Sequence, residues 1–462
     1  MIVRIRPFLD IEKISKALAG ETEPGERPVR EFESALASWL GASNAIAVDR
    51  GRSALLLALK ILHIKKGDEI IVQSYIFHAV IDAILEAGAI PVLADSGLGD
   101  FNVAPTAIER EITSRTKAII ATHLGIPCDM DEITGIARRH NCYLIENCAL
   151  TLGAAYGGQK TGKFGDMSFF SFDVDKPIST GDGGMLVINN GSLLESARDI
   201  LAGYGRTPLA TEKEIVCGLL LQHYVTGEEI YPDKCFLPVD FGKETIKNDR
   251  RLLSLVETAA RNGAADKFRG QVLPYLKQRN LLSENKSSRL NHIISRAKSR
   301  ARATFGSVNP PKVDSPYLLM NSLRSEVGLE CLKDYGDCKA IRDRNAQYYI
   351  DHLDAAGFQH PLIPAGKRPA FIRYAVLNNT GYENSFITGA ARKEGIEIGI
   401  FNWSQPIHLC YPYNRLLDFD RSRLHNSEHL GNRLLSLPVH PYVGAEGLEK
   451  IVRFLNGFAL RK

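Results

Sequence analysis

Short apolar runs alternate with amphipathic stretches between residues 45 and 189. The runs are AIAV, EIIVQS, IPVLAD, AIIATH, YLIENC, MSFFSF and GGMLVIN. Most stretches between them, such as SALLLALKILHI and AVIDAILEAG, carry apolar residues at helical spacing. Strands that alternate with helices form a mainly parallel sheet covered on both faces. The pattern therefore predicts a three-layer α/β domain whose functional residues gather at the carboxyl ends of the strands.

The pattern changes after residue 206. Residues 207–313 lack a strand rhythm and contain a basic tract, KSSRLNHIISRAKSRARATFG, which together predict an inserted, mostly helical segment. A long helical pattern starts at about residue 317, and a smaller α+β domain follows it. We therefore expect a large domain with an N-terminal arm at 1–206, the insertion at 207–313, and a linking helix with a small carboxyl-terminal domain at 314–462.

Charge and cysteine content add little to this picture. The 462 residues carry a net charge of +4, from 57 basic and 53 acidic side chains, which does not indicate a nucleic-acid partner. The basic tract could bind an anionic ligand or a membrane surface, or it could be a solvated helix face. The eight cysteines form no Cys-x-x-Cys pair, so we expect neither a metal site nor a disulfide framework.

The apolar content also bears on location. No apolar run is long enough for a transmembrane helix, and the amino terminus lacks the continuous core of a signal peptide. We therefore expect a cytoplasmic protein without a transmembrane segment.

The stretch SFDVDKPISTGDGG, residues 171–184, has the residues of a cofactor site. Lys176 follows an apolar strand and precedes a glycine cluster. A lysine held partly desolvated at a strand end can condense with a carbonyl group, which is how pyridoxal phosphate is held. A lysine in a surface turn would have the same local sequence, so the stretch alone leaves both interpretations open.

A second stretch, DRGRSALLLAL, fits a phosphate site. It places Gly51, Arg52 and Ser53 at the start of a predicted helix, where backbone amides, a guanidinium and a hydroxyl can surround an anion. Ser171 offers a further hydroxyl shortly before Lys176.

Several ordered blocks carry a resemblance to a known family. They include EFESALASWLGASNAIAVDRGRSALLLAL, GDEIIVQSYIFHAVIDAILEAGAIPVLAD, RTKAIIATHLGIPCDMDEITGIARRHNCYLIENCA, GDMSFFSFDVDKPISTGDGG, MNSLRSEVGLECL and LLSLPVHPYV. Over residues 25–206 and 317–455 the chain resembles the DegT/DnrJ-type sugar aminotransferases, which are pyridoxal-phosphate enzymes of the aspartate aminotransferase fold. The resemblance implies a mainly parallel seven-stranded sheet (fold type I) and pyridoxal 5'-phosphate as the cofactor.

The resemblance also implies roles for single residues. Lys176 matches the lysine that holds the cofactor as a Schiff base, while Gly51, Arg52, Ser53 and Ser171 fall where the phosphate is bound. Phe77 matches the aromatic residue that stacks on the pyridine ring. Ala149 matches the small residue on the other face of that ring.

The chain departs from the family pattern at three positions. Asn147 replaces the carboxylate that pairs with the pyridine nitrogen, and an amide supplies no negative charge there. Leu150 replaces a glutamine beside the cofactor. Tyr317 stands where the family carries an asparagine that reaches the neighbouring subunit. Glu146 lies beside Asn147, but in a strand its side chain points to the opposite face.

Three further residues lie in blocks shared with the family. His123 follows a predicted strand and could line the pocket or be a satisfied core histidine. Trp403 and His408 match the segment of the small domain that closes the active site.

The function implied is the transfer of an amino group, from a donor such as glutamate, to a nucleotide-linked keto sugar through the Lys176 imine. The family also implies a homodimer. Two alternatives stay open because of Asn147 and Leu150: a pyridoxal-phosphate enzyme of different chemistry, such as a sugar dehydratase, or a catalytically degenerate member.

Overall fold

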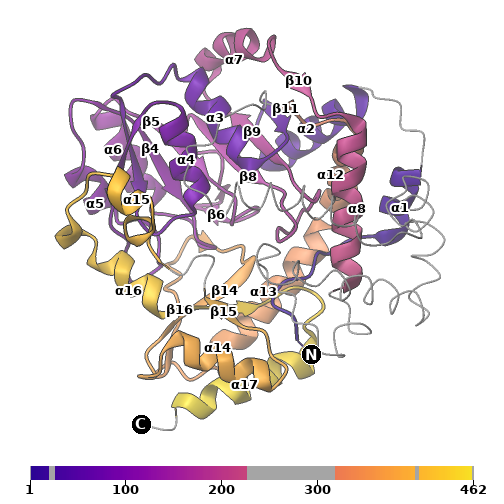
Figure 1. Cartoon of the computed structure of the whole chain (residues 1–462), viewed down its shortest axis with the longest axis vertical. Coiled ribbons are helices and arrows are strands. Elements are labelled where there is room, and N and C mark those ends of the chain that lie inside the picture. Colours follow the sequence, from indigo (N-terminus) through magenta and orange to yellow (C-terminus); the bar gives the residue numbers. More distant parts are fainter. Residues whose placement is uncertain (1, 20–25, 226–317, 401–404, 460–462) are drawn as a thin grey trace.

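A nine-stranded sheet forms the centre of the large domain (Figure 1). The computed structural model describes residues 2–19, 26–225, 318–400 and 405–459. In spatial order the strands are β10 (Gly205–Arg206), β11 (Leu318–Leu319), β1 (Ala45–Val48), β9 (Gly184–Ile188), β8 (Met167–Ser171), β5 (Tyr143–Asn147), β4 (Thr116–Thr122), β2 (Glu69–Gln73) and β3 (Ile90–Ala94).

The sheet is mainly parallel, as the alternating pattern predicts. β3, β2, β4, β5 and β8 pair in parallel, and β9 pairs antiparallel with both β8 and β1. Hence β1 runs in the same direction as β8, and six strands end at one edge. The seven expected strands are all present, and the two-residue strands β10 and β11 extend the sheet beyond β1.

Helices cover both faces of the sheet, so the expected three layers are confirmed. Every residue of β2 is buried, because Ile70 and Val72 face one helical layer and Ile71 faces the other. The first layer is α3 (Gly51–Ile61), α4 (His78–Glu86) and α7 (Leu194–Leu201). The second is α5 (Pro105–Arg110), α6 (Met130–Arg139), α1 (Ile11–Ala19), α2 (Glu26–Leu40), α8 (Leu209–Val225) and α12 (Ser322–Lys333).

The expected long helix after residue 317 is two helices. The chain first forms β11, then α12, and it turns at Asp334 into α13 (Tyr335–His352). The turn inserts Tyr335 into the core, where its hydroxyl donates to the Leu152 carbonyl and its ring packs edge-on against Trp39, with 5.4 Å between centroids. Tertiary packing therefore interrupts a pattern that is continuous in sequence.

The small domain is built on a second, antiparallel sheet. Its order is β12 (Phe358–Gln359), β14 (Arg373–Asn378), β16 (Leu434–Pro438) and β15 (Gly399–Ile400). Residues of α13, α14 (Asn384–Lys393) and α17 (Gly444–Ala459) form one apolar core with it. This arrangement matches the expected α+β domain. None of the described helices is long and apolar enough to cross a membrane.

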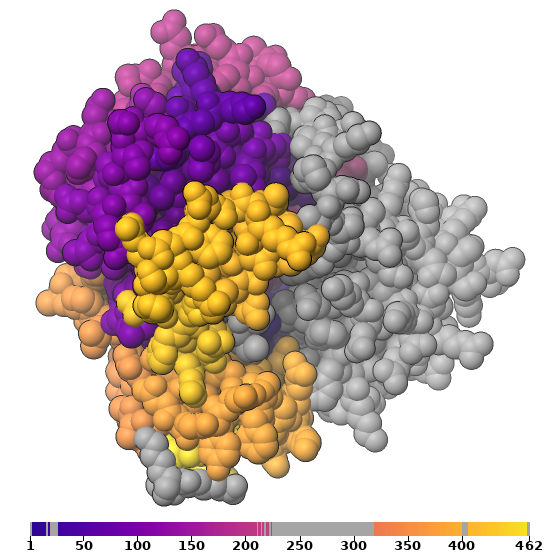
Figure 2. All heavy atoms as spheres, turned by 60° about the vertical axis from the view of Figure 1, so that its left-hand side comes forward, coloured from indigo at the N-terminus to yellow at the C-terminus, as the bar shows by residue number. Residues whose placement is uncertain are grey.

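Two segments of the small domain reach back to the large domain. Residues 405–433 carry α15 (Tyr413–Leu416) and α16 (His425–Arg433), and Ile407, Leu417 and Leu424 join the apolar core of α3 and α4. In Figure 2 the gold surface of this segment lies against the indigo and purple large domain. The strand β13 (Lys367–Arg368) pairs with β6 (Ala155–Tyr156), which forms a hairpin with β7 (Gln159–Lys160).

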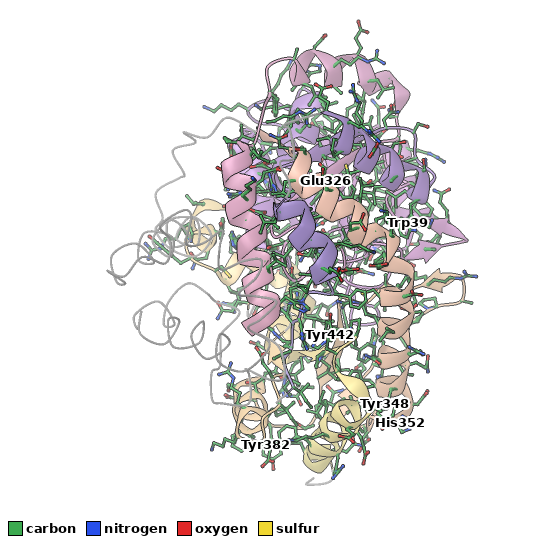
Figure 3. All side chains as sticks on the ribbon, turned by 90° about the vertical axis from the view of Figure 1, so that its right-hand side faces the viewer. Trp39, Glu326, Tyr348, His352, Tyr382 and Tyr442 are labelled. Carbon is green, nitrogen blue, oxygen red and sulfur yellow. The ribbon has the colours of Figure 1, made fainter. Side chains whose placement is uncertain are left out.

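Part of the expected insertion lies outside the described residues. Its first part, up to Val225, is α8, which runs beside α12 (Figure 3). Residues 226–313, with the basic tract, are not among those described, and the same holds for Tyr317 and Trp403.

Candidate active site

Lys176 lies in the turn that joins β8 to β9, at the edge where the parallel strands end. Its backbone N–H donates to the Asp173 carbonyl at 3.0 Å, which closes the turn. Its side chain is 12% exposed, and Nζ lies 2.7 Å from Oδ1 of Asp175. The lysine side chain is therefore largely buried and paired rather than in open solvent.

Asp175 also contacts the small domain. Its Oδ2 accepts a hydrogen bond from Nη2 of Arg373 at 3.0 Å, and Arg373 is the first residue of β14. Burial opposes ionisation of the Asp175 carboxyl, but Lys176 and Arg373 outweigh burial and lower its pKa to about 2. The site therefore holds a fixed negative charge between one cation from each domain.

The amino terminus of α3 lies beside the end of β8. A Cβ atom on Gly51 would lie 3.1 Å from Cβ of Ser171, so the helix start and this serine are in contact. Arg50 provides no side-chain cap, and Ala54 is the first residue whose N–H bonds back, to the Arg50 carbonyl at 3.2 Å. The earlier amides of a helix have no intrahelical acceptor, so this helix start can bind an anion.

Gly184 fixes the shape of this helix start. A Cβ atom on it would lie 2.6 Å from the carbonyl carbon and oxygen of Arg50 and 2.7 Å from the Gly51 nitrogen. Strand β9 therefore runs directly against the turn before α3, and only glycine allows this approach.

The side chain of Arg52 has a partner of its own. Nη2 of Arg52 donates to the Glu86 carboxylate at 2.5 Å. The backbone amides of Arg52 and Ser53 remain at the helix start beside Ser171. The phosphate role predicted for Arg52 and Ser53 stays a prediction, and in this arrangement the backbone amides support it.

The remaining cofactor positions lie at the ends of neighbouring strands. Asn147 ends β5 and is buried; its Oδ1 accepts from the Ala149 N–H at 3.2 Å, and its Nδ2 donates to Oγ1 of Thr122 at 3.3 Å. Phe77 precedes α4, and its ring packs on that of His78 with 4.3 Å between centroids. These residues therefore share one edge of the sheet with Lys176.

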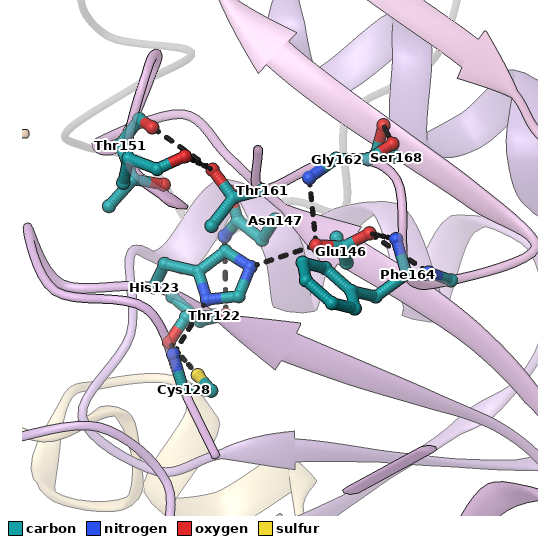
Figure 4. Close-up of polar contacts among 12 residues, drawn as sticks. Thr122, His123, Cys128, Glu146, Asn147, Thr151, Thr161, Gly162, Phe164 and Ser168 are labelled. Atoms are coloured by element: carbon teal, nitrogen blue, oxygen red, sulfur yellow. Dashed lines mark hydrogen bonds and ion pairs between the residues drawn. The ribbon is translucent and has the colours of Figure 1, made fainter. Parts of the chain in front are cut away.

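His123 is a satisfied core histidine rather than a pocket residue (Figure 4). It is fully buried, and its Nδ1 accepts from the Cys128 N–H at 3.0 Å. The proton therefore resides on Nε2, which donates to the Glu146 carboxylate at 3.2 Å. Glu146 also accepts from the amides of Gly162, Phe164 and Gly165. As predicted, Glu146 points away from the face that Asn147 occupies.

The ligand atoms of His123, Glu146 and Cys148 lie within 4.8 Å of one another, as in a metal site. The hydrogen bonds of Glu146 and His123 already engage the carboxylate and both ring nitrogens. Burial raises the pKa of the Cys148 thiol well above its ordinary value, which disfavours the thiolate that binds metals. This cluster therefore serves to pack the 162–165 loop against β5.

His408 connects the small domain to the end of β2. Its Nδ1 lies 2.6 Å from the hydroxyl of Ser74, and its Nε2 lies 3.2 Å from the Glu428 carboxylate. Arg421 and His408 hold the pKa of Glu428 at about 2, so Glu428 accepts the Nε2 proton and Ser74 donates to Nδ1. The network fixes residues 405–428 against the strand end that leads to Phe77.

Sequence reasoning missed several charged residues of the site. Asp175 precedes Lys176 directly, so its position was a usable signal. Arg373 and the buried pair of Arg324 with Glu212 had no local signal, because their partners lie far away in sequence.

The residues present fit pyridoxal phosphate. The helix start beside Ser171 suits the phosphate, and Lys176 offers an amine at the same sheet edge. The buried amide of Asn147 offers hydrogen bonds to a ring nitrogen but no charge.

Comparison with known proteins gives the family. A sequence profile of the DegT/DnrJ/EryC1/StrS aminotransferase family matches residues 10–217 and 316–456, well over half of the chain. The chain belongs to this family. The family uses pyridoxal phosphate, in agreement with the site. Residues 218–315, most of the expected insertion, lie outside the matched ranges.

Curated relatives match part of the chain. The GDP-perosamine synthase of Caulobacter vibrioides is 44% identical over 183 residues, which are 39% of this chain and 49% of the relative. The dTDP-3-amino-3,6-dideoxy-alpha-D-galactopyranose transaminase of Aneurinibacillus thermoaerophilus is 39% identical over 212 residues, 43% of this chain and 58% of the relative. The chain thus spans about half the length of the curated relatives it matches.

Solved structures share the fold of this chain. S. venezuelae DesV superposes with a TM-score of 0.69 at 21% identity, and the match covers 100% of both chains. Helicobacter pylori PseC gives a TM-score of 0.69 at 20% identity, again over 100% of both chains. The aspartate-aminotransferase architecture expected from the sequence is therefore confirmed.

Proposed function

We propose that the protein is a pyridoxal-phosphate-dependent aminotransferase that transfers an amino group to a nucleotide-linked keto sugar. The observation that carries the proposal is the meeting of Lys176, the open start of α3 and Ser171 at one sheet edge. Family membership supports the reaction class, and the names of the relatives support GDP- or dTDP-linked sugars as substrates.

Different residues of the chain have different roles in this reaction. The amides of Gly51, Arg52 and Ser53, with the Ser171 hydroxyl, bind the phosphate. The amine of Lys176 would hold the cofactor and would move the proton of the donor's α carbon. When bound, pyridoxal phosphate supplies the electron sink that stabilises the carbanion formed at that carbon.

Asn147 sets how strong this electron sink is. Its amide nitrogen has two hydrogens, of which Thr122 accepts one, so the other can be offered to a ring nitrogen that carries no proton. A carboxylate would instead favour the protonated nitrogen. We therefore infer a weaker electron sink than in members that carry the acid.

The experiment uses the full chain loaded with cofactor. GDP- and dTDP-linked keto sugars are incubated separately with glutamate, and the products are weighed by mass spectrometry. A product in which NH2 and H replace the keto oxygen supports the proposal. If no keto sugar is aminated while glutamate still converts the cofactor to its amine form, the substrate class is wrong.

Asn147 and Leu150 favour one alternative, a pyridoxal-phosphate enzyme of different chemistry such as dehydration. The same incubation separates the two, because a dehydratase product loses the mass of water and gains no nitrogen. A degenerate member would give neither product. The homodimer and the cytoplasmic location expected from the sequence belong to this proposal, and sedimentation of the purified chain tests the first.

A further inference from the structure

Asp175 joins one cation from each domain. Its Oδ1 lies 2.7 Å from Nζ of Lys176, in the turn after β8, and its Oδ2 lies 3.0 Å from Nη2 of Arg373, at the start of β14. The Arg373 side chain is only 6% exposed. We propose that Asp175 is a positioning residue, which holds the Lys176 amine in place through an anchor on the small domain. This inference rests on the proposed function, because that function gives Lys176 its task.

Asp175 acts as a counter-ion and not as a base. Although burial disfavours the ionised form, Lys176 and Arg373 together keep the pKa of Asp175 at about 2. A carboxylate of that strength does not remove a proton from an ammonium group at neutral pH. Its contribution is therefore to fix the position and charge of the lysine before the cofactor arrives.

Arg373 keeps Asp175 paired with a cation when Lys176 loses its proton. An amine attacks a carbonyl carbon only after its proton has passed to solvent, and Asp175 then loses its cationic partner. A buried carboxylate without a partner is strongly unfavourable. Because Arg373 remains bound to Oδ2, Asp175 stays compensated whether Lys176 is charged or neutral. The lysine can therefore change state without destabilising the interface between the domains.

Other charged or titratable groups surround this pair and act on it in every variant. They are Asp173 from the same turn, with Asp182 and Arg50 close to it, Arg4 from the amino-terminal segment, Tyr75 after β2 and Arg342 of α13. Burial and the charges of Asp175 and Asp182 raise the pKa of Asp173 to about 7, so Asp175→Asn also favours ionisation of Asp173. The variants are therefore compared over a series of pH values rather than at a single pH.

The test measures the reactivity of the Lys176 amine in the full chain freed of cofactor. The chain is acetylated at several pH values, and mass spectrometry follows Lys176 relative to Lys450, a lysine of α17. Asp175→Asn should speed acetylation of Lys176 about three- to tenfold near neutral pH, because loss of the carboxylate favours the neutral amine. Arg373→Gln should slow acetylation of Lys176 by a similar factor. In this variant Asp175 pairs with Lys176 alone and therefore favours the charged amine more strongly.

The two variants should change the acetylation rate of Lys176 in opposite directions, and this distinguishes a positioning role from structural damage. A loosened turn would expose Lys176 and speed its acetylation in both variants, which would overturn the proposal. An unchanged rate in Asp175→Asn would also overturn it. Where Arg373→Gln fails to fold, Arg373→Lys keeps the cation and should react like the unmodified chain, while a rate as fast as that of Asp175→Asn would contradict the anchor.

A matched control uses a second aspartate–lysine pair at the same distance. Asp129 lies 2.7 Å from Nζ of Lys367, so Asp129→Asn should change Lys367 and leave Lys176 unchanged. Borohydride reduction of the loaded chain shows separately which lysine binds the cofactor. If that lysine is not Lys176, the proposed function fails whatever the acetylation rates are.

Discussion

The guanidinium of Arg324 and the carboxylate of Glu212 form an ion pair with no solvent exposure, 3.0 Å between Nε and Oε1. Glu212 belongs to α8, the helix that leads toward the insertion, and Arg324 belongs to α12. Nη1 of Arg324 donates to the carbonyls of Asp49, which precedes α3, and of Asp182, in the turn that leads into β9. The pair therefore connects α8 to the candidate phosphate site.

Removal of one partner should destabilise the fold strongly. In Glu212→Gln the Arg324 charge stays buried without its counter-ion, which should lower the free energy of unfolding by about 3–5 kcal/mol. Urea denaturation measures this change. The control is Glu449→Gln, which breaks an exposed pair with Arg453 and should cost less than about 1 kcal/mol. Equal effects in the two variants would show that burial of the Arg324 pair does not matter.

Much of the fold, but less of the site, could be predicted from sequence. Runs such as EIIVQ in β2 are apolar on both faces, so their burial is visible locally. The glycines around Lys176 also signal a site locally. The contact of Asp175 with Arg373 depends on how two domains pack, and no local pattern encodes it. Likewise, the sequence could not show that Arg52 turns toward Glu86, since both partners occur in ordinary helical patterns.

Gly184→Ala should weaken cofactor binding at least tenfold. The added methyl group would lie 2.6 Å from the Arg50 carbonyl and 2.7 Å from the Gly51 nitrogen, so the turn that offers the amides must move. Titration of the cofactor-free chain, followed by absorbance, gives the dissociation constant. Gly191→Ala is the control, because no atom lies within 4 Å of its added methyl group. A wild-type constant for Gly184→Ala would contradict the assignment of the turn.

Two buried histidines should make the fold sensitive to acid. His223 on α8 donates to the Pro7 carbonyl and His440 donates to the Val3 carbonyl, beside Tyr442 (labelled in Figure 3). Burial, with a smaller effect of Arg6, lowers the pKa of His223 to about 4, and burial lowers that of His440 to about 3.

Since both folded-state values lie below the unfolded value of about 6.5, the unfolded chain binds these protons first. Stability is therefore retained above pH 6.5 and falls as the pH decreases toward 4, by up to about 1.4 kcal/mol per pH unit for each histidine. Urea denaturation at pH 7, 6 and 5 measures the slope. The variant His223→Gln/His440→Gln should show a smaller slope, and an identical slope would rule out these residues as its source.

Asn147→Asp tests which reaction the site favours. Asn147 uses Oδ1 to accept from Ala149 and Nδ2 to donate to Thr122, and an aspartate keeps the first contact while the Thr122 hydroxyl can donate to its second oxygen. The substitution therefore adds a negative charge without an obvious change in packing. In an aminotransferase limited by a weakly protonated ring, each unit by which the pKa of the ring nitrogen rises corresponds to about 1.4 kcal/mol, or about tenfold in rate. Single-turnover conversion of the loaded chain with glutamate should then accelerate by about this factor.

If the amide of Asn147 serves another reaction, the Asn147→Asp variant should instead lose native turnover while it gains conversion with glutamate. No conversion in either chain, with cofactor bound, would rule out transamination from glutamate, because the missing charge would then not be what limits the site.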